Sequence, residues 1–147
     1  MELAKLIDVE CVIPNLCASS KKQALRSLSQ CAADHTGQSQ QQIFDALLER
    51  ERLGTTGVGG GVAIPHGKLA SLEHLYGLFA RLETPIDFES IDEKPVDLIF
   101  LLLAPESAGA DHLKTLARVT RLLRDKTVCE ELRDSDNYEN LLSLITN

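Results

Sequence analysis

The stretch that most constrains the fold is residues 96–104, which are nearly all aliphatic. An apolar run without alternating polar residues is typical of a strand whose two faces are both covered, as in α/β proteins. Pro105 ends the run, since proline has no N–H to donate to a sheet. Helical patterns stand on both sides of this strand, and short connections around Pro85 favour some antiparallel pairing. The sequence therefore predicts an α/β domain, with a mixed, mainly buried β-sheet and helices on both faces.

Two helices are predicted before the buried strand, each from a capping box at its start. Ser20 with Gln23 begins the first helix, and Gly37 closes it. Ser39 with Gln42 begins the second. Because apolar residues follow both boxes at helical spacing, we expect a helical layer packed on the sheet.

Two more helices are predicted after the buried strand. The first is expected to start from Asp111 as its N-cap, and the second follows a capping box of Thr127 and Glu130. The residues expected to face inward are Leu113, Leu116, Ala117, Thr120 and Leu123 in the first helix, and Tyr138, Leu141, Leu142 and Ile145 in the second.

The remaining pattern predicts short strands and the links between them. The strands are residues 11–17, weakened by Pro14, residues 62–64 and residues 74–82; the links are a helical turn at 2–7, loops at 55–61 and 68–73, and a turn with a brief extended piece at 82–88. Only residues 96–104 have the composition of a central strand.

Residues 58–67 place a histidine at the end of a predicted strand. Three glycines leave the backbone free to turn and let another molecule come close. The apolar residues 62–64 then form a strand that Pro65 stops. The imidazole of His66 is thus held from behind and open in front, as suits a nucleophile presented to a partner. The plain alternative is a turn histidine without a role, which is the commoner case for an isolated histidine.

The segment resembles the histidine motif of the fructose/mannitol-type enzyme IIA domains of the bacterial phosphotransferase system. In that family an acidic or amide residue stands seven positions before an aliphatic-Gly-x-x-aliphatic-Ala-aliphatic-Pro-His-Gly segment. Here Glu51 stands seven positions before Val58, and residues 58–67 match throughout. The resemblance spans nearly the whole chain; it extends to residues 82–86 and 94–98, and residues 49–57 and 126–129 are most similar to the nitrogen-regulatory branch.

The resemblance implies a site around His66 as the phosphoryl acceptor. The family carries an arginine sixteen residues before its active histidine, and Arg50 has that spacing. Its guanidinium is therefore expected to stabilise the charge of the phosphoryl oxygens, the alternative being a solvated helix end. His112 corresponds to a second histidine of the family, expected to orient or stabilise the phosphoryl. At a helix start it should stay neutral, and the alternative is a surface histidine.

Four glycines are expected to cradle the phosphoryl group with their backbone N–H groups: Gly59, Gly60, Gly61 and Gly67. Gly60 departs from the family pattern, in which sugar-type members resemble one another in an acidic residue and nitrogen-type members tend to have asparagine. A nucleotide site is excluded, because Gly60 stands where the P-loop needs lysine and Val62 interrupts the dinucleotide fingerprint.

The function implied by the resemblance is protein-to-protein phosphoryl transfer. Neutral His66 would accept a phosphoryl group on Nε2 from the histidine-containing phosphocarrier protein, and its phosphorylation state would regulate target proteins. Neither a metal nor a cofactor is expected. One alternative is a sugar-specific IIA component that passes the phosphoryl group to a IIB domain for fructose or mannitol uptake. The other is a non-catalytic binding regulator in which His66 is not phosphorylated.

Length and charge narrow the class of partner. The 147 residues fit one domain, residues 1–147. The net charge of −7 argues against nonspecific nucleic-acid binding and suits a protein partner with a basic face. No apolar run approaches the roughly 18 residues of a spanning helix, and Met1 begins no signal peptide. We therefore expect a cytoplasmic protein without membrane insertion.

Overall fold

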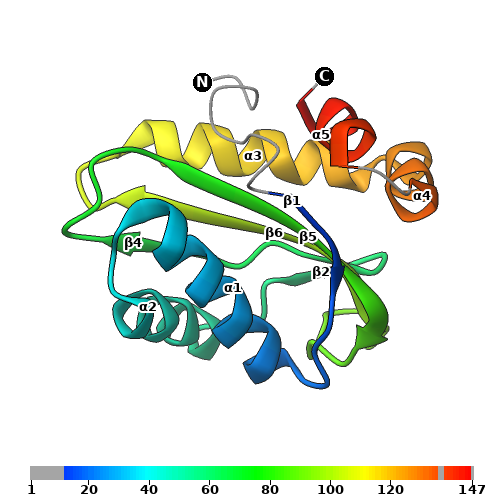
Figure 1. Cartoon of the computed structure of the whole chain (residues 1–147), viewed down its shortest axis with the longest axis horizontal. Coiled ribbons are helices and arrows are strands. Elements are labelled where there is room, and N and C mark those ends of the chain that lie inside the picture. The colour runs from blue at the N-terminus through cyan, green and yellow to red at the C-terminus, as the bar shows by residue number, and fades with distance from the viewer. Residues whose placement is uncertain (1–11, 136–137, 147) are drawn as a thin grey trace.

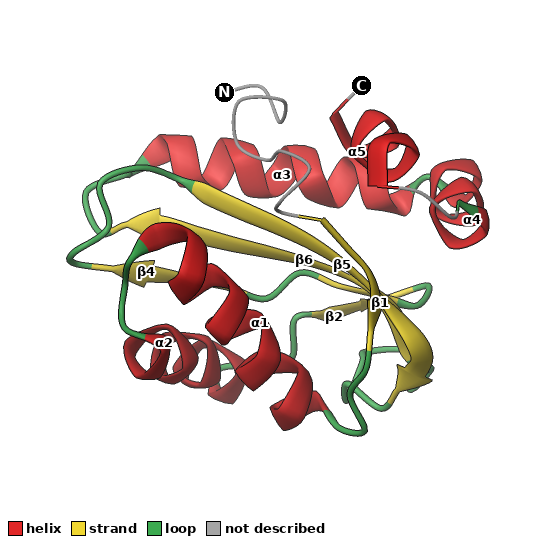
Figure 2. Ribbon diagram, in the orientation of Figure 1, coloured by secondary structure: helices red, strands yellow, loops and turns green. Residues whose placement is uncertain are grey.

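The computed structural model describes residues 12–135 and 138–146. Its centre is a six-stranded sheet with helices on both faces (Figure 1; Figure 2). The predicted α/β architecture with a mixed sheet is confirmed, whereas the helical turn predicted at 2–7 lies outside the described residues. The elements in chain order are β1 (Val12–Leu16), α1 (Lys21–Thr36), α2 (Gln40–Arg52), β2 (Gly57–Gly59), β3 (Val62–Ala63), β4 (His66–Leu69), β5 (Tyr76–Ile86), β6 (Val96–Pro105), α3 (Ala110–Arg124), α4 (Lys126–Asp134) and α5 (Tyr138–Thr146).

β6 is the central strand of the sheet. It pairs antiparallel with β5 on one side and parallel with β3 and β4 on the other. β1 runs parallel to β5, and β2 runs antiparallel to β3. Residues 98–104 are completely buried, which confirms the prediction of a strand covered on both faces.

β3 and β4 together form one interrupted strand along β6, with Ile64 and Pro65 at the break. Pro65 has no N–H, but its carbonyl accepts a hydrogen bond of 3.0 Å from the amide of Leu102. The chain therefore continues along β6 after the proline, and His66 begins a strand where the sequence predicted the end of one. For the same reason residues 68–69, predicted as loop, belong to β4.

Helices α1 and α2 cover one face of the sheet, and α3 and α5 lie on the other (Figure 1). The predicted starts of α1 and α2 are confirmed, since the side chains of Ser20 and Ser39 accept hydrogen bonds from the amides of Gln23 and Gln42, the third residue of each helix. Gly37 ends α1 with a φ of 74°, as predicted.

The predicted end of the strand at residue 82 was wrong. β5 continues through residues 82–86, because Ile86 still pairs with Val96 of β6.

The predictions for the later helices need correction. Helix α3 begins at Ala110 after Gly109, so Asp111 lies in its first turn instead of capping it. Its buried face also differs from the predicted one, since polar residues occupy part of it: His112, Thr115, Val119 and Leu123 are buried, while Leu113 is 64% exposed.

The last predicted helix is two helices, α4 and α5. Asp125 caps α4 by accepting from the amides of Thr127 and Val128, so Thr127 does not begin the helix as predicted. The inward positions predicted for Leu141 and Ile145 of α5 are confirmed, since both side chains are fully buried.

The glycine triplet forms the turn of a hairpin between β2 and β3. Gly60 and Gly61 have φ values of 68° and 80°, which a two-residue hairpin turn of type I′ requires. The amide of Gly60 donates to Asp92 Oδ2 at 3.0 Å, and its carbonyl accepts from Arg133 at 2.9 Å. Arg133 also holds Asp97 through two hydrogen bonds of 2.8 and 2.9 Å. The hairpin is thus tied to α4 and to the start of β6.

The two turn glycines should differ in their tolerance of a side chain. Asparagine accepts a positive φ better than most residues, so the shared backbone cost of Gly60→Asn and Gly61→Asn is small. A Cβ on Gly60 has no neighbour within 4 Å, whereas one on Gly61 would lie 2.5 Å from Arg133 Nη2 and 3.0 Å from Asp97 Oδ1. We expect Gly61→Asn to lose about 1–3 kcal/mol of unfolding free energy more than Gly60→Asn in urea titrations. Equal losses would show that the Arg133 contacts contribute nothing.

Candidate active site

Both ring nitrogens of His66 are held, and their partners define the tautomer. Nδ1 lies 2.9 Å from the carbonyl oxygen of Ile64, which can only accept, so Nδ1 carries the proton. Nε2 lies 3.1 Å from Nε of Arg50, which can only donate, so Nε2 is unprotonated. The ring is therefore a neutral imidazole whose free electron pair is on Nε2, the atom predicted to accept the phosphoryl group.

Arg50 reaches His66 from the last turn of α2. One turn earlier, Ala46 packs against β4 at Gly67, where a Cβ would lie only 3.3 Å from the Ala46 Cβ. The absence of a side chain at Gly67 thus lets the helix come close to the strand. The Arg50 guanidinium also donates to the carbonyl of Gly54 at 2.8 Å, which anchors it beside the imidazole. The structure brings these two predicted residues together, and the solvated helix end considered for Arg50 is not what is found.

His112 lies in the first turn of α3 and faces the same imidazole. The centroids of the His66 and His112 rings are 5.8 Å apart and the rings are inclined at 49°. His112 is 5% exposed, so it is not the surface histidine considered as its alternative. Its Nδ1 is buried and has no hydrogen-bond partner among the described residues. His112 is therefore near enough to contact a group bound to His66. Because Nδ1 of His112 has no partner, the described residues do not determine which of its ring nitrogens carries the proton.

The surroundings favour the neutral form of both imidazoles. Burial is the largest cause that lowers the pKa of His66, and Arg50 lowers it further, against the opposing effects of the Ile64 hydrogen bond and Glu51. The pKa of His112 is lowered by burial first, and then by the positive charge that His66 and Lys68 would place beside it. At neutral pH the free electron pair of His66 is therefore available.

The imidazole of His66 opens into a hollow of about 430 Å³. The hollow is lined by Ala46, Glu49, Arg50, Leu53, His66, Gly67, Lys68 and His112. Arg50, Lys68 and His112 are the side chains that could hold an anionic group there. Lys68 was not predicted from the sequence, although it directly follows the histidine motif.

Of the four glycines predicted to cradle a phosphoryl group, Gly67 alone lines the hollow. The other three lie at the hairpin turn, and the amide of Gly60 is already used by Asp92. The structure does not bring Gly59, Gly60 or Gly61 to His66, so their expected role in phosphoryl binding is not supported. The glycine at position 60, which departs from the family pattern, therefore affects the hairpin turn and does not contact the imidazole of His66.

Glu51 helps to position His66 through a chain of hydrogen bonds, a role that the sequence did not reveal. Its carboxylate accepts hydrogen bonds from the amide and the hydroxyl of Thr56, at 3.0 and 2.5 Å. The carbonyl of Thr56 accepts from the amide of Ile64 at 3.0 Å, and Ile64 in turn binds Nδ1 of His66. The only signal in the sequence was the fixed spacing of Glu51 before Val58.

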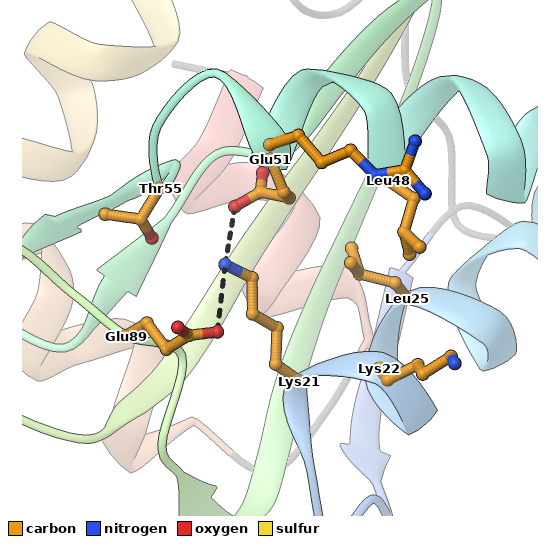
Figure 3. Close-up of a pocket in the computed structure, with 8 residues that line it drawn as sticks. Lys21, Lys22, Leu25, Leu48, Glu51, Thr55 and Glu89 are labelled. Carbon is orange, nitrogen blue, oxygen red and sulfur yellow. Dashed lines mark ion pairs between the residues drawn. The ribbon is translucent and has the colours of Figure 1, made fainter.

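A second hollow, of about 480 Å³, lies beside Glu51 between α1 and α2 (Figure 3). Lys21 extends into it from the start of α1 and pairs with Glu51 at 2.9 Å and with Glu89 at 3.8 Å. Since the Glu51 side chain is only 7% exposed, this ammonium group compensates a buried carboxylate. None of the residues predicted for the site lines this hollow.

Within residues 12–135 and 138–146, no three His, Cys, Asp or Glu side chains are grouped so as to hold a metal ion. No helix in the same ranges is both long and apolar enough to cross a membrane.

Comparison with known proteins places the chain in a family. The family model for the "Phosphoenolpyruvate-dependent sugar phosphotransferase system, EIIA 2" matches residues 5–147. The chain is 57% identical over 145 residues to the nitrogen regulatory protein of Bradyrhizobium diazoefficiens, covering 99% of this chain and 95% of that protein. The crystal structure of the nitrogen regulatory protein IIA-Ntr from Neisseria meningitidis superposes with a TM-score of 0.94 at 32% identity, covering 98% of this chain and 99% of that one. Mannitol IIA from Escherichia coli, at 21% identity, shares the fold with a TM-score of 0.79 over 95% of this chain and 98% of its own. This chain belongs to the EIIA type 2 family of the phosphoenolpyruvate-dependent sugar phosphotransferase system.

Proposed function

We propose that this chain is a phosphoryl-accepting regulator of the nitrogen-related phosphotransferase system. It takes a phosphoryl group from the histidine-containing phosphocarrier protein onto Nε2 of His66, and its phosphorylation state controls the target proteins it binds. The observation that supports this most is the unprotonated Nε2, which faces a hollow beside the guanidinium of Arg50. The proposal includes residues 1–147 acting as one domain in the cytoplasm, without membrane insertion or a nucleic-acid partner.

The transfer follows from the tautomer. The electron pair of Nε2 attacks the phosphorus while the P–N bond of the donor breaks, and the donor imidazole leaves with the electrons of that bond. No proton has to leave His66, because the proton on Nδ1 remains there, in its hydrogen bond of 2.9 Å to the Ile64 carbonyl. The transition state of phosphoryl transfer is loose, so the site contributes alignment and charge stabilisation. Arg50 turns from Nε2 to the phosphoryl oxygens, and a neutral His112 donates its N–H to them.

The surface around the hollow fits a macromolecular donor. Leu53, which lines the hollow, is 82% exposed, and Leu113, the neighbour of His112, is 64% exposed. Large apolar side chains that are exposed near a binding hollow suit a protein-interaction surface. We expect the phosphocarrier and the regulated targets to cover these two leucines.

The assignment to nitrogen regulation rests on the similarity to the Bradyrhizobium protein, which is 57% identical over nearly its whole length. The likeness to the mannitol enzyme is 21% identical and supports the fold alone. The sugar-specific and binding-only alternatives are therefore kept as outcomes of the experiment.

The deciding experiment is incubation with a phosphoenolpyruvate-driven phosphocarrier system, followed by detection of an acid-labile phosphoryl group. We expect the label on wild-type protein and on His74→Gln, which alters an exposed histidine outside the site. We expect none on His66→Gln. An unlabelled wild type would leave only the binding regulator. Rapid passage of the label to a sugar-specific IIB domain would establish the transport alternative.

Arg50 and Arg52 form a matched pair for testing charge stabilisation. Both are arginines at the end of α2, but Arg50 contacts His66 whereas Arg52 is exposed and pairs with Glu49. We expect Arg50→Gln to slow phosphoryl uptake by about 10- to 100-fold, since hydrogen bonds to charged groups are worth about 1.5–3 kcal/mol. Arg52→Gln should keep the wild-type rate, measured as initial labelling under limiting donor. Equal rates for the two variants would remove Arg50 from the mechanism.

The neutrality of His66 can be measured in the bare protein. Because burial and Arg50 lower its pKa, its ring resonances should titrate with a midpoint below the ordinary value of about 6.5. Between the two pKa values the unfolded chain binds a proton at His66 and the folded chain does not. The contribution of His66 to the free energy of unfolding is therefore fully present above the unfolded pKa, and it is lost as the pH falls towards the folded pKa. We expect histidine NMR titrations to show the low midpoint, and His66→Gln to make the acid decline in unfolding free energy shallower. A midpoint at or above the ordinary value would contradict the neutral nucleophile.

A further inference from the structure

Two buried polar atoms without a partner belong to residues one helical turn apart at the candidate active site. Among the described residues, three buried side-chain atoms lack a hydrogen-bond partner: Ser90 Oγ, His112 Nδ1 and Thr115 Oγ1. His112 and Thr115 are one turn apart on the buried face of α3, with exposures of 5% and 1%. Each such atom is costly in a low-dielectric interior, so a joint arrangement that pairs them is strongly favoured.

The hydroxyl of Thr115 differs from three other hydroxyls in helices α1 and α3. Ser29, Thr36 and Thr120 each donate to the carbonyl four residues earlier, at 2.7, 2.7 and 2.8 Å. This local bond is the usual solution for a helical hydroxyl. Thr115 does not make it, so its hydroxyl is free to serve a different acceptor.

The geometry of the helix identifies that acceptor. Side chains three positions apart lie on one face, with their Cβ atoms about 5–6 Å apart. Helical side chains also lean towards the N-terminus, so Thr115 lies over the turn that carries His112. The two atoms make no direct hydrogen bond, but at this separation one bridging water can join a hydroxyl and a ring nitrogen.

We propose that Thr115 is a positioning residue for His112. Its hydroxyl donates towards Nδ1 of His112 through a single buried water, and so keeps the ring proton on Nε2. The inference rests on the proposed function for its purpose: an Nε2–H on His112 is the donor that a phosphoryl group on His66 needs. The reverse arrangement, with Nδ1–H donating to the hydroxyl, would leave Nε2 as an acceptor facing anionic oxygens.

The tautomer can be read directly from side-chain ¹⁵N NMR spectra of the bare protein, with His112 assigned by His112→Gln. We expect a protonated Nε2 and an unprotonated Nδ1 in the wild type. Thr115→Val keeps the β-branched shape but removes the hydroxyl, and should convert His112 to a mixture of tautomers. Thr115→Ser should restore the wild-type pattern. Thr120→Val is the matched control, because it removes a hydroxyl from the same helix that bonds only to Leu116.

The same variants give a second readout in phosphoryl uptake. We expect Thr115→Val to be about threefold to tenfold slower than wild type, and Thr115→Ser and Thr120→Val to be close to it. A protonated Nδ1 on His112 in the wild type would overturn the inference, and so would a Thr115→Val protein with unchanged tautomer and rate. A wild type that takes up no phosphoryl group would overturn the proposed function instead, while the tautomer of the bare protein still decides the role of Thr115.

Discussion

The hydrogen bond from Nδ1 of His66 to the carbonyl of Ile64 is the interaction on which the rest of the site depends. It places the ring proton, and thereby makes Nε2 the nucleophilic atom. The carbonyl can serve this purpose because its own peptide is held by Thr56, and Thr56 by the buried carboxylate of Glu51. An acidic side chain behind the loop thus fixes the electronic state of an imidazole that it does not touch.

The break in the strand along β6 decides where this imidazole stands. Pro65 ends one ladder and His66 begins the next, so the ring lies at an edge position of the sheet. Helices from both faces can reach such a position: α2 brings Arg50 from one face and α3 brings His112 from the other (Figure 1). Gly67 permits the first approach, because a side chain there would meet Ala46. The site is therefore a product of layer packing around a sheet edge, with no single loop that encloses it.

Features set by local chemistry could be predicted from the sequence. The buried strand, the caps at Ser20 and Ser39, and the grouping of Arg50 and His112 with His66 all follow from composition or from spacing within a family motif. Features set by tertiary contacts could not. The glycine triplet has the composition of a ligand-binding loop, yet contacts to Asp92 and Arg133 make it a hairpin turn. Likewise the buried face of α3 carries His112 and Thr115, so counting apolar residues placed Leu123 correctly but missed the polar part of that face.

The unphosphorylated site holds donors that a phosphoryl group would satisfy better than the protein does. Arg50 gives a charged N–H to the neutral Nε2, a weaker acceptor than an anionic oxygen. In the proposed phosphorylation, bonding phosphorus to Nε2 would consume that electron pair, so Arg50 would need a new acceptor, which the phosphoryl oxygens would supply. His112 is also near, since the centroid of its ring lies 5.8 Å from the centroid of the His66 ring. Under the proposed function, phosphorylation would therefore change the contacts of α2 and α3 together. Leu53 lines the same hollow, Leu113 follows His112 in the chain, and both are exposed. A target protein that covers those leucines can distinguish the two states through side chains that report on the phosphoryl group.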